Sequence, residues 1–178
     1  MEVTYRCYEL DPTAKRDIKE SMNETLAKKY GMSLAQAKAN TDRVVQMAKE
    51  VGLDYQMDTL IQTNTFDAHR VTMFAKEKGL MKEMTERILQ AYFTESKHIG
   101  DQDTLADLAA DVGLDREEVK NMLVSEEMTA EVRTDEQLAR QYGISGVPFF
   151  LINNKYALFW CTASRSFRAG APESDCRG

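Results

Sequence analysis

Pro148 stands directly in front of an apolar run, residues 149–152, and this limits what the end of the chain can form. A proline has no N–H to donate to a sheet ladder, so it belongs at the first residue of a strand or on an edge strand. The helical pattern of residues 134–142 stops at Gly143, and a short turn leads on to the proline. We therefore predict a helix, a turn and a strand in that order. The Val147–Pro148 peptide bond is a candidate for the cis form, which folded proteins keep mainly in tight turns.

The composition is that of a packed globular chain. Hydrophobic residues make up 43% of its 178 residues, with only three prolines and nine glycines, so we expect one domain, or one domain with an insertion. A net charge of −6 argues against nucleic acid and anionic membranes as partners, because both bind basic surfaces. No apolar run approaches the ~20 residues of a membrane helix. Residues 1–6 lack the apolar core of a signal peptide, so we expect a cytoplasmic protein.

The three cysteines, Cys7, Cys161 and Cys176, lie far apart and form no Cys-x-x-Cys pair. With only two histidines beside them, a metal site is not expected. A disulfide framework is not expected in a reducing compartment. Cys7 is predicted to be a buried strand residue that acts as a small hydrophobe.

Local signals divide the chain into one strand, a series of helices and a hairpin. Residues 2–10 alternate as a strand does, and a polar helix is expected over residues 13–30. Ser33 and Gln36 form a capping-box pattern for the next helix, which ends at Gly52. Further helices are expected from Thr65 to Gly79, over 80–97, from Asp103 to Gly113, from Asp115 onward and through 132–142. A hairpin is expected between strands 149–152 and 155–158, because Asn153-Asn154 suits its tight turn.

A sheet of three short strands is too small for all the predicted helices to pack against it. We therefore expect the helices to form a packed lobe that is inserted into a small α/β domain. The acidic residues of the last helix, Glu131, Asp135 and Glu136, are expected to lie on a solvated helix face.

Several stretches together resemble one family. They are residues 8–12 (Tyr-Glu-Leu-Asp-Pro), 63–70 (Thr-Asn-Thr-Phe-Asp-Ala-His-Arg), 91–93 (Ala-Tyr-Phe), 113–115 (Gly-Leu-Asp) and 143–150 (Gly-Ile-Ser-Gly-Val-Pro-Phe-Phe). They resemble the DsbA-like branch of the thioredoxin fold, in particular the FrnE-type oxidoreductases. These are related to hydroxychromene-carboxylate isomerases and kappa-class glutathione transferases. The resemblance implies an α/β protein, mostly helical overall, with a thioredoxin-like core over residues 1–11 and 131–178 and a large inserted all-helical lobe over residues 12–130.

Both ends of the chain depart from the family pattern. The family's first strand and its redox helix, which starts at a Cys-Pro-x-Cys-like pair, would lie before Met1, so we expect an N-terminally truncated, incomplete core. An exposed sheet edge would then favour association, and a homodimer is one expected form. After Leu158 the family continues with a Ser-Gly-Ala-Gln-Pro-like turn, and a one-base shift of the reading frame permits that sequence here. On this hypothesis Cys161 and Cys176 have no evolved function.

The resemblance also implies where a substrate would bind. Gly146, Val147, Pro148 and Phe149 correspond to the loop that presents its backbone to an extended substrate, and they are the candidate substrate-binding residues. Asn64, Phe66 and His69 begin a helix that lines the cleft in relatives, and they are pocket candidates. For His69 the residues alone also fit a helix-start histidine satisfied by a local carboxylate. No catalytic residue and no metal ligand is assigned within the chain.

These expectations lead to one function and two alternatives. The first is a thiol–disulfide oxidoreductase or isomerase of the DsbA family, acting on a dithiol or disulfide protein or peptide, whose Cys-x-x-Cys is not in this chain. As written, this polypeptide is predicted to be redox-inactive and to need no cofactor. The second is a glutathione-dependent isomerase or transferase of the hydroxychromene-carboxylate type, with glutathione as cofactor. The third is a cysteine-less, non-catalytic binding protein, so the residues leave open whether the chain is an enzyme.

Overall fold

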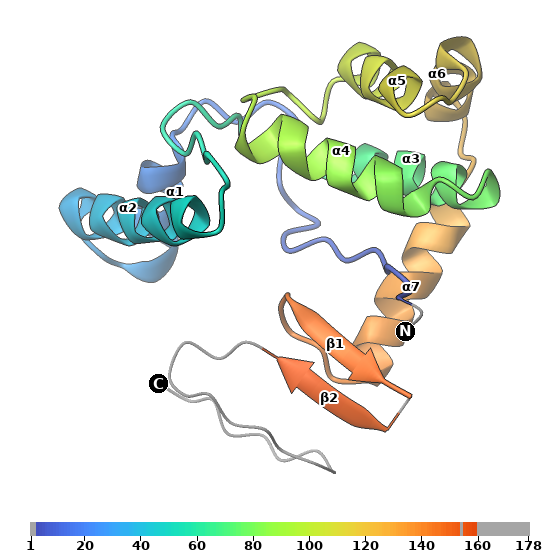
Figure 1. The fold of residues 1–178 in the computed structure, drawn as a ribbon. Coiled ribbons are helices and arrows are strands. Elements are labelled where there is room, and N and C mark those ends of the chain that lie inside the picture. Colours follow the sequence, from blue (N-terminus) through green and yellow to red (C-terminus); the bar gives the residue numbers. More distant parts are fainter. Residues whose placement is uncertain (1–2, 154, 160–178) are drawn as a thin grey trace.

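A computed structural model describes residues 3–153 and 155–159, and the described part is mostly helical with one small hairpin (Figure 1). The helices are α1 Met22–Tyr30, α2 Leu34–Glu50, α3 Phe66–Glu77, α4 Met81–Phe93, α5 Gln102–Asp111, α6 Arg116–Val124 and α7 Thr129–Gln141. The strands are β1 Phe149–Ile152 and β2 Tyr156–Phe159. Within the described residues, no helix combines the length and the apolar character that crossing a membrane requires.

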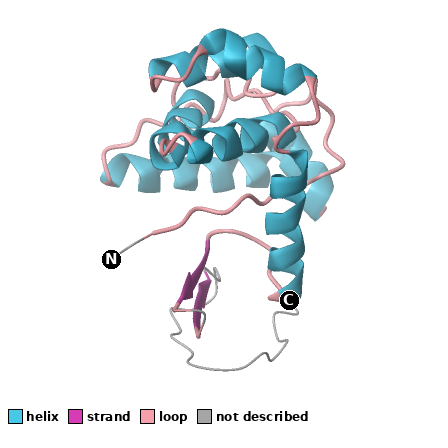
Figure 2. Ribbon diagram, turned by 90° about the vertical axis from the view of Figure 1, so that its right-hand side faces the viewer, coloured by secondary structure: helices cyan, strands magenta, loops and turns pink. Residues whose placement is uncertain are grey.

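Helices α3 to α6 enclose the hydrophobic core, and α3 lies at its centre because it contacts α4, α5, α6 and α7. Residues from outside this group complete the core: Cys7 from the N-terminal segment, Met128 before α7 and Val132 within it. Figure 2 shows the helices stacked above the N-terminal segment, which runs beneath them towards α7. The core thus joins the N-terminal segment and α7 to helices α3 to α6.

Helices α1 and α2 pack against each other at one side of the molecule (Figure 1). Each begins with a capping box, Ser21 with Glu24 and Ser33 with Gln36, and the second confirms the sequence prediction. The helix predicted over residues 13–30 is wrong in its first half, because α1 starts only at Met22. The chain before it makes tertiary bonds instead: the Lys15 carbonyl oxygen accepts from the Asn64 N–H at 3.0 Å.

Helix α3 starts where the sequence predicts but is capped by a different side chain, whereas the cap of α5 lies two residues before the predicted one. Thr65 precedes α3 but makes no side-chain cap; the Asn64 Oδ1 accepts the Phe66 N–H at 2.8 Å in its place. The cap of α5 is Asp101, whose carboxylate accepts the Thr104 N–H at 2.9 Å, whereas Asp103 was predicted. Asp103 instead forms ion pairs with Arg116 and Lys120 of α6. These partners lie too far along the chain for a local sequence pattern to indicate them.

The buried guanidinium of Arg70, on α3, closes the C-terminal end of α6. It donates hydrogen bonds to four carbonyl oxygens, those of Met122, Leu123, Ser125 and Glu127, at 2.6–3.2 Å. A helix leaves its last carbonyls without partners, so this arginine supplies the donors that the end of α6 lacks. An ion pair with Asp67 at 2.9 Å balances its charge.

The strand predicted over residues 2–10 is absent from the described residues 3–10. This segment is held by side chains rather than by a neighbouring strand. The Cys7 N–H donates to the Asp135 carboxylate at 2.9 Å, and the Tyr8 hydroxyl donates to the Ile144 carbonyl oxygen at 3.5 Å. An alternating pattern indicates an extended chain, but a strand also needs a paired partner, which the described residues do not supply.

The hairpin after α7 is confirmed, with the second strand starting one residue later than predicted. Its strands are antiparallel, with Phe149 opposite Phe159 and Ile152 opposite Tyr156. Asn153 has a φ of 52°, as expected for the turn, whereas Asn154 lies outside the described residues. The C-terminal residues 160–178, to which the frameshift hypothesis applies and which include Cys161 and Cys176, also lie outside them.

Candidate functional site

The N-terminal segment, α3 and α7 meet at a group of polar side chains, which we call the Glu9 cluster: Glu9, Asn64, Phe66, Arg133 and Glu136. The Glu9 side chain is only 1% exposed. One of its oxygens accepts from the Asn64 Nδ2 at 3.2 Å, and the other from the Arg133 Nη1 at 2.7 Å. Glu9 thereby connects the N-terminal segment to both helices.

Arg133 is the cation of this cluster. The same Nη1 donates to Glu136 at 2.7 Å, and the guanidinium carbon lies 4.1 Å from the centre of the Phe66 ring. Such a cation–π contact adds to the two charge-assisted bonds and fixes the plane of the guanidinium. Two carboxylates therefore share one arginine nitrogen.

A second ion pair lies beside the Glu9 cluster. The Asp135 side chain is buried, and its carboxylate accepts from the Arg6 Nη1 at 2.8 Å and from the Cys7 N–H. Asp135 thus holds the N-terminal segment directly, while the next residue of α7, Glu136, binds Arg133, which in turn binds Glu9. The burial of Asp135 and Glu136 corrects the prediction that they lie on a solvated helix face.

Sequence reasoning missed Glu9, Arg133, Asp135 and Glu136, although a signal was present. The buried positions of α7 are Val132, Asp135, Glu136 and Ala139. They follow the i, i+3, i+4, i+7 spacing of a helix face that turns to the core. Acidic residues at those positions indicate buried, partnered carboxylates rather than a solvated face.

The three pocket candidates all lie near this cluster, in different roles. Asn64 and Phe66 belong to it, and both are engaged by neighbours within the protein. His69 is one turn further along α3, and burial lowers the pKa of its imidazole, although the Glu136 charge and the Tyr8 backbone act in the opposite direction. A histidine with a lowered pKa is neutral at pH 7.

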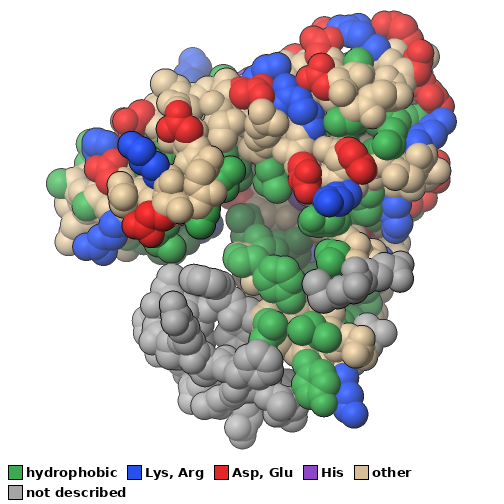
Figure 3. All heavy atoms as spheres, in the orientation of Figure 1, with side chains coloured by type: hydrophobic (Ala, Val, Ile, Leu, Met, Phe, Trp, Pro, Cys, Tyr) green, Lys and Arg blue, Asp and Glu red, His purple; other side chains and the backbone are tan. Residues whose placement is uncertain are grey.

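The predicted docking residues lie at the start of the hairpin. The Val147–Pro148 peptide bond is cis, and Val147 is 50% exposed. Phe149 is partly buried at the first position of β1, and Phe150 is 57% exposed. Among the described residues β1 pairs only with β2, so its other edge carries backbone groups without a strand partner. Figure 3 shows hydrophobic side chains gathered at the hairpin, whereas charged ones are spread over the helices above.

The docking residues and the pocket candidates are not joined directly. In the described part of the chain, no hydrogen bond or ion pair connects residues 146–149 to Asn64, Phe66 or His69. The nearest link is the Tyr8 hydroxyl on the Ile144 carbonyl oxygen, two residues before Gly146. The N-terminal segment therefore bridges the two regions.

Cys7 is the cysteine that the structure describes, and it is a free, buried thiol. Burial raises its pKa to about 12, with the Asp135 charge adding to the effect. The thiolate is the reactive form in disulfide exchange. Cys7 therefore fills space in the core, as predicted, although not in a strand.

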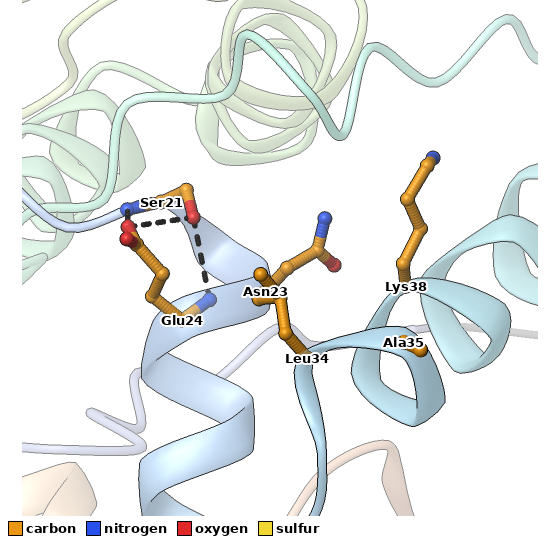
Figure 4. Close-up of a pocket in the computed structure, with 6 residues that line it drawn as sticks. All are labelled: Ser21, Asn23, Glu24, Leu34, Ala35 and Lys38. Atoms are coloured by element: carbon orange, nitrogen blue, oxygen red, sulfur yellow. Dashed lines mark hydrogen bonds between the residues drawn. The ribbon is translucent and has the colours of Figure 1, made fainter.

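A hollow at the surface lies elsewhere, between the first turns of α1 and α2 (Figure 4). It has a volume of about 580 Å³ and is lined by Ser21, Asn23, Glu24, Leu34, Ala35 and Lys38. Glu24 is turned back onto Ser21 in the capping box, and Lys38 is paired with Asp42. Asn23 accepts from the Thr41 hydroxyl at 2.8 Å, so these polar groups already have partners within the protein. Among the described residues, no group of three or more His, Cys, Asp and Glu side chains is arranged to hold a metal ion.

Helix α7 leads through the cis-proline turn at Pro148 into the β1–β2 hairpin, and the other helices lie on one side of these elements (Figure 2). This arrangement defines a thioredoxin-like protein with a helical insertion. Comparison with known families agrees. The family model described as a DSBA-like thioredoxin domain matches residues 1–168, and the chain belongs to this family.

Two known proteins are similar to the chain. A crystal structure of the probable DsbA oxidoreductase SCO1869 from Streptomyces coelicolor superposes with a TM-score of 0.84 at 36% identity, covering 89% of this chain and 68% of that one. The uncharacterized protein YwbO of Bacillus subtilis (strain 168) is 37% identical over 89 residues. That match covers 46% of this chain and 41% of YwbO, so less than half of the relative's length is represented.

Proposed function

We propose that this chain carries the substrate-docking part of a DsbA-type thiol–disulfide oxidoreductase, of the FrnE kind. The observation that supports this most is the half-exposed Val147 in front of a strand whose outer edge has no partner among the described residues. An extended peptide can add to such an edge by main-chain hydrogen bonds, while the exposed side chains select its sequence. The expected partner is a protein or peptide that contains a disulfide or a dithiol.

The polypeptide as written does not exchange disulfides on this proposal. The sequence contains no Cys-x-x-Cys, and the thiol of Cys7 is both buried and held in its protonated form. Exchange requires an accessible thiolate, so docking and chemistry are separated here.

The experiment compares binding with turnover. We expect a disulfide-containing peptide to bind, as measured by fluorescence polarisation, while the rate of insulin reduction with dithiothreitol equals that of a blank. Val147→Pro removes one backbone N–H from the docking segment and should weaken the peptide at least tenfold. Lys155→Ala, in the hairpin turn, is the matched control. Insulin reduction well above the blank would contradict the proposed inactivity.

The glutathione-dependent alternative makes a different prediction. It requires a cleft that takes up the tripeptide near Asn64 and His69, so millimolar glutathione should raise the unfolding temperature through binding to the native state. We expect no rise, because Asn64 and Phe66 are already bound to Glu9 and Arg133.

A further inference from the structure

Glu9 and Glu136 bring like charges together inside the protein. Both accept from the same nitrogen, the Arg133 Nη1, each at 2.7 Å. Their side chains are 1% and 6% exposed, whereas Arg133 is 46% exposed. Two ionised carboxylates at one arginine leave one negative charge in excess, and water does little to screen it at such burial.

The hydrogen bonding of Glu136 also shows more acceptors at this site than donors. Its Oε1 is buried and has no hydrogen-bond partner among the described residues. An ionised carboxylate only accepts, so two ionised carboxylates cannot bond to each other. A single proton on the pair would supply an O–H donor between them and would make the pair and Arg133 neutral together.

The other charged groups around the pair do not remove the excess. On the N-terminal segment, Arg6 is matched by Asp135 of α7 at 2.8 Å. From α3, burial lowers the pKa of His69, so this side chain adds no charge at neutral pH. Further along α7, the charge of Arg140 helps to lower the pKa of Glu136, but this side chain is exposed and makes no hydrogen bond or ion pair to either carboxylate among the described residues. Arg133 is therefore the cation in contact with both carboxylates.

We propose that Glu9 and Glu136 hold one proton between them, and that this proton clamps the N-terminal segment to α7 until rising pH removes it. The clamp acts on residues 6–9, which are bound by Asp135 and Arg133 of α7 and by Asn64, just before α3. Because the Tyr8 hydroxyl reaches the Ile144 carbonyl oxygen, release of this segment also frees the turn before Gly146.

The electrostatic environment of the two groups agrees with this arrangement. Burial raises the pKa of Glu9 despite its bond to Arg133. The pKa of Glu136 is lowered, because bonds from Arg133 and Glu9 outweigh its burial. Two carboxyl groups in such close interaction release their protons in two steps that belong to the pair and not to either residue alone.

The sign of the pH effect follows from linkage. A carboxyl group whose pKa is raised in the folded state binds its proton more tightly there than in the released segment. Its stabilising effect is complete below the ordinary value of 4.5 and is lost as the pH rises through the raised pKa. Between those two values the equilibrium for release of the segment should increase up to tenfold per pH unit.

Two measurements test the proposal. The first is an NMR titration of the glutamate side-chain carboxyl carbons in the unmodified chain, with Glu9→Gln and Glu136→Gln used to assign the two signals. We expect one of the pair to titrate above 4.5 and the other below it. Titration of both groups near 4.5 would overturn the proposal, and this readout does not require that either variant be stable.

The second measurement is hydrogen exchange of the Cys7 N–H against pH, corrected for the intrinsic rate. Glutamine at position 9 or 136 provides a permanent N–H donor. In either variant the corrected exchange rate of the Cys7 N–H should therefore no longer rise by up to tenfold per pH unit. Glu131→Gln, an exposed carboxylate on the same helix, should retain it. A pH dependence that survives in Glu9→Gln would show that the pair does not hold the segment.

Discussion

At the scale of single residues, charged side chains at buried positions decide how the ends of the chain meet. Glu9, Asp135 and Glu136 are all buried, and each has an arginine partner. Buried charges are retained in proteins when they are paired, and loss of one partner leaves the other uncompensated. Cys7 lies within this same environment, between Asp135 and the core, and its chemistry follows from that position.

Cys7 should be unreactive in the folded protein. With Cys161 and Cys176 replaced by serine, the remaining thiol should resist labelling by a disulfide reagent at pH 8, because burial holds its pKa at about 12. In denaturant it should react at the rate of a free cysteine. The labelling rate is measured by absorbance, and rapid reaction without denaturant would show that the N-terminal segment does not cover the thiol.

At the scale of elements, the ends of helices depend on partners from other helices as much as on local caps. Asp115 caps α6 as its sequence predicts, by accepting the Glu118 N–H at 2.8 Å. At the other end of α6, Ser125 donates locally to the Met122 carbonyl oxygen, and Arg70, more than 50 residues away in the chain, donates to the carbonyl oxygens around it. Arg70 therefore fixes the position of α6 on α3.

Replacing Arg70 with methionine should destabilise the protein by about 3 kcal/mol, because it leaves buried carbonyl oxygens without donors. Methionine keeps most of the aliphatic volume, so the cost reflects hydrogen bonds rather than a cavity. Urea unfolding gives the free energy, and Arg116→Met, which removes an exposed arginine of α6, is the control. Equal losses for the two variants would mean that Arg70 is not a special support for α6.

At the scale of the whole molecule, the hairpin exposes both apolar side chains and a strand edge. Val147, Phe150, Ile152 and Tyr156 are all substantially exposed, and among the described residues β1 has one edge without a strand partner. Unpaired edges with apolar side chains favour association with other chains. The same surface that we propose to dock a substrate thus also favours self-association.

Phe150→Lys should therefore reduce association of the chain with itself. Sedimentation velocity over a range of concentrations measures the effect, and we expect the variant to remain monomeric at concentrations at which the unmodified chain associates. Tyr30→Lys replaces a similarly exposed aromatic residue on α1, far from the hairpin, and should change nothing. If the unmodified chain is monomeric at every concentration measured, the prediction of a homodimer is wrong.

The sequence by itself determined the elements whose signals are local. The capping box at Ser33, the cap at Asp115, and the helix ends at Gly31 and Gly143, both with positive φ, depend on residues within one or two turns. The hairpin and the thioredoxin-like family were also predictable, because the turn at Pro148 and each of the family motifs is a short continuous stretch of sequence. The docking role of residues 146–149 stays a prediction.

Only the tertiary structure decided that residues 3–10 do not pair as a strand and that Asp135 and Glu136 are buried. Glu9 meets Arg133 across a separation of 124 residues, and Cys7 meets Asp135 across 128. An alternating segment becomes a strand only when another strand pairs with it, and an acidic residue is buried only when a cation or donor is brought to it. Such partners are supplied by the packing of α3 against α7, and no local pattern in the sequence specifies which residues will meet.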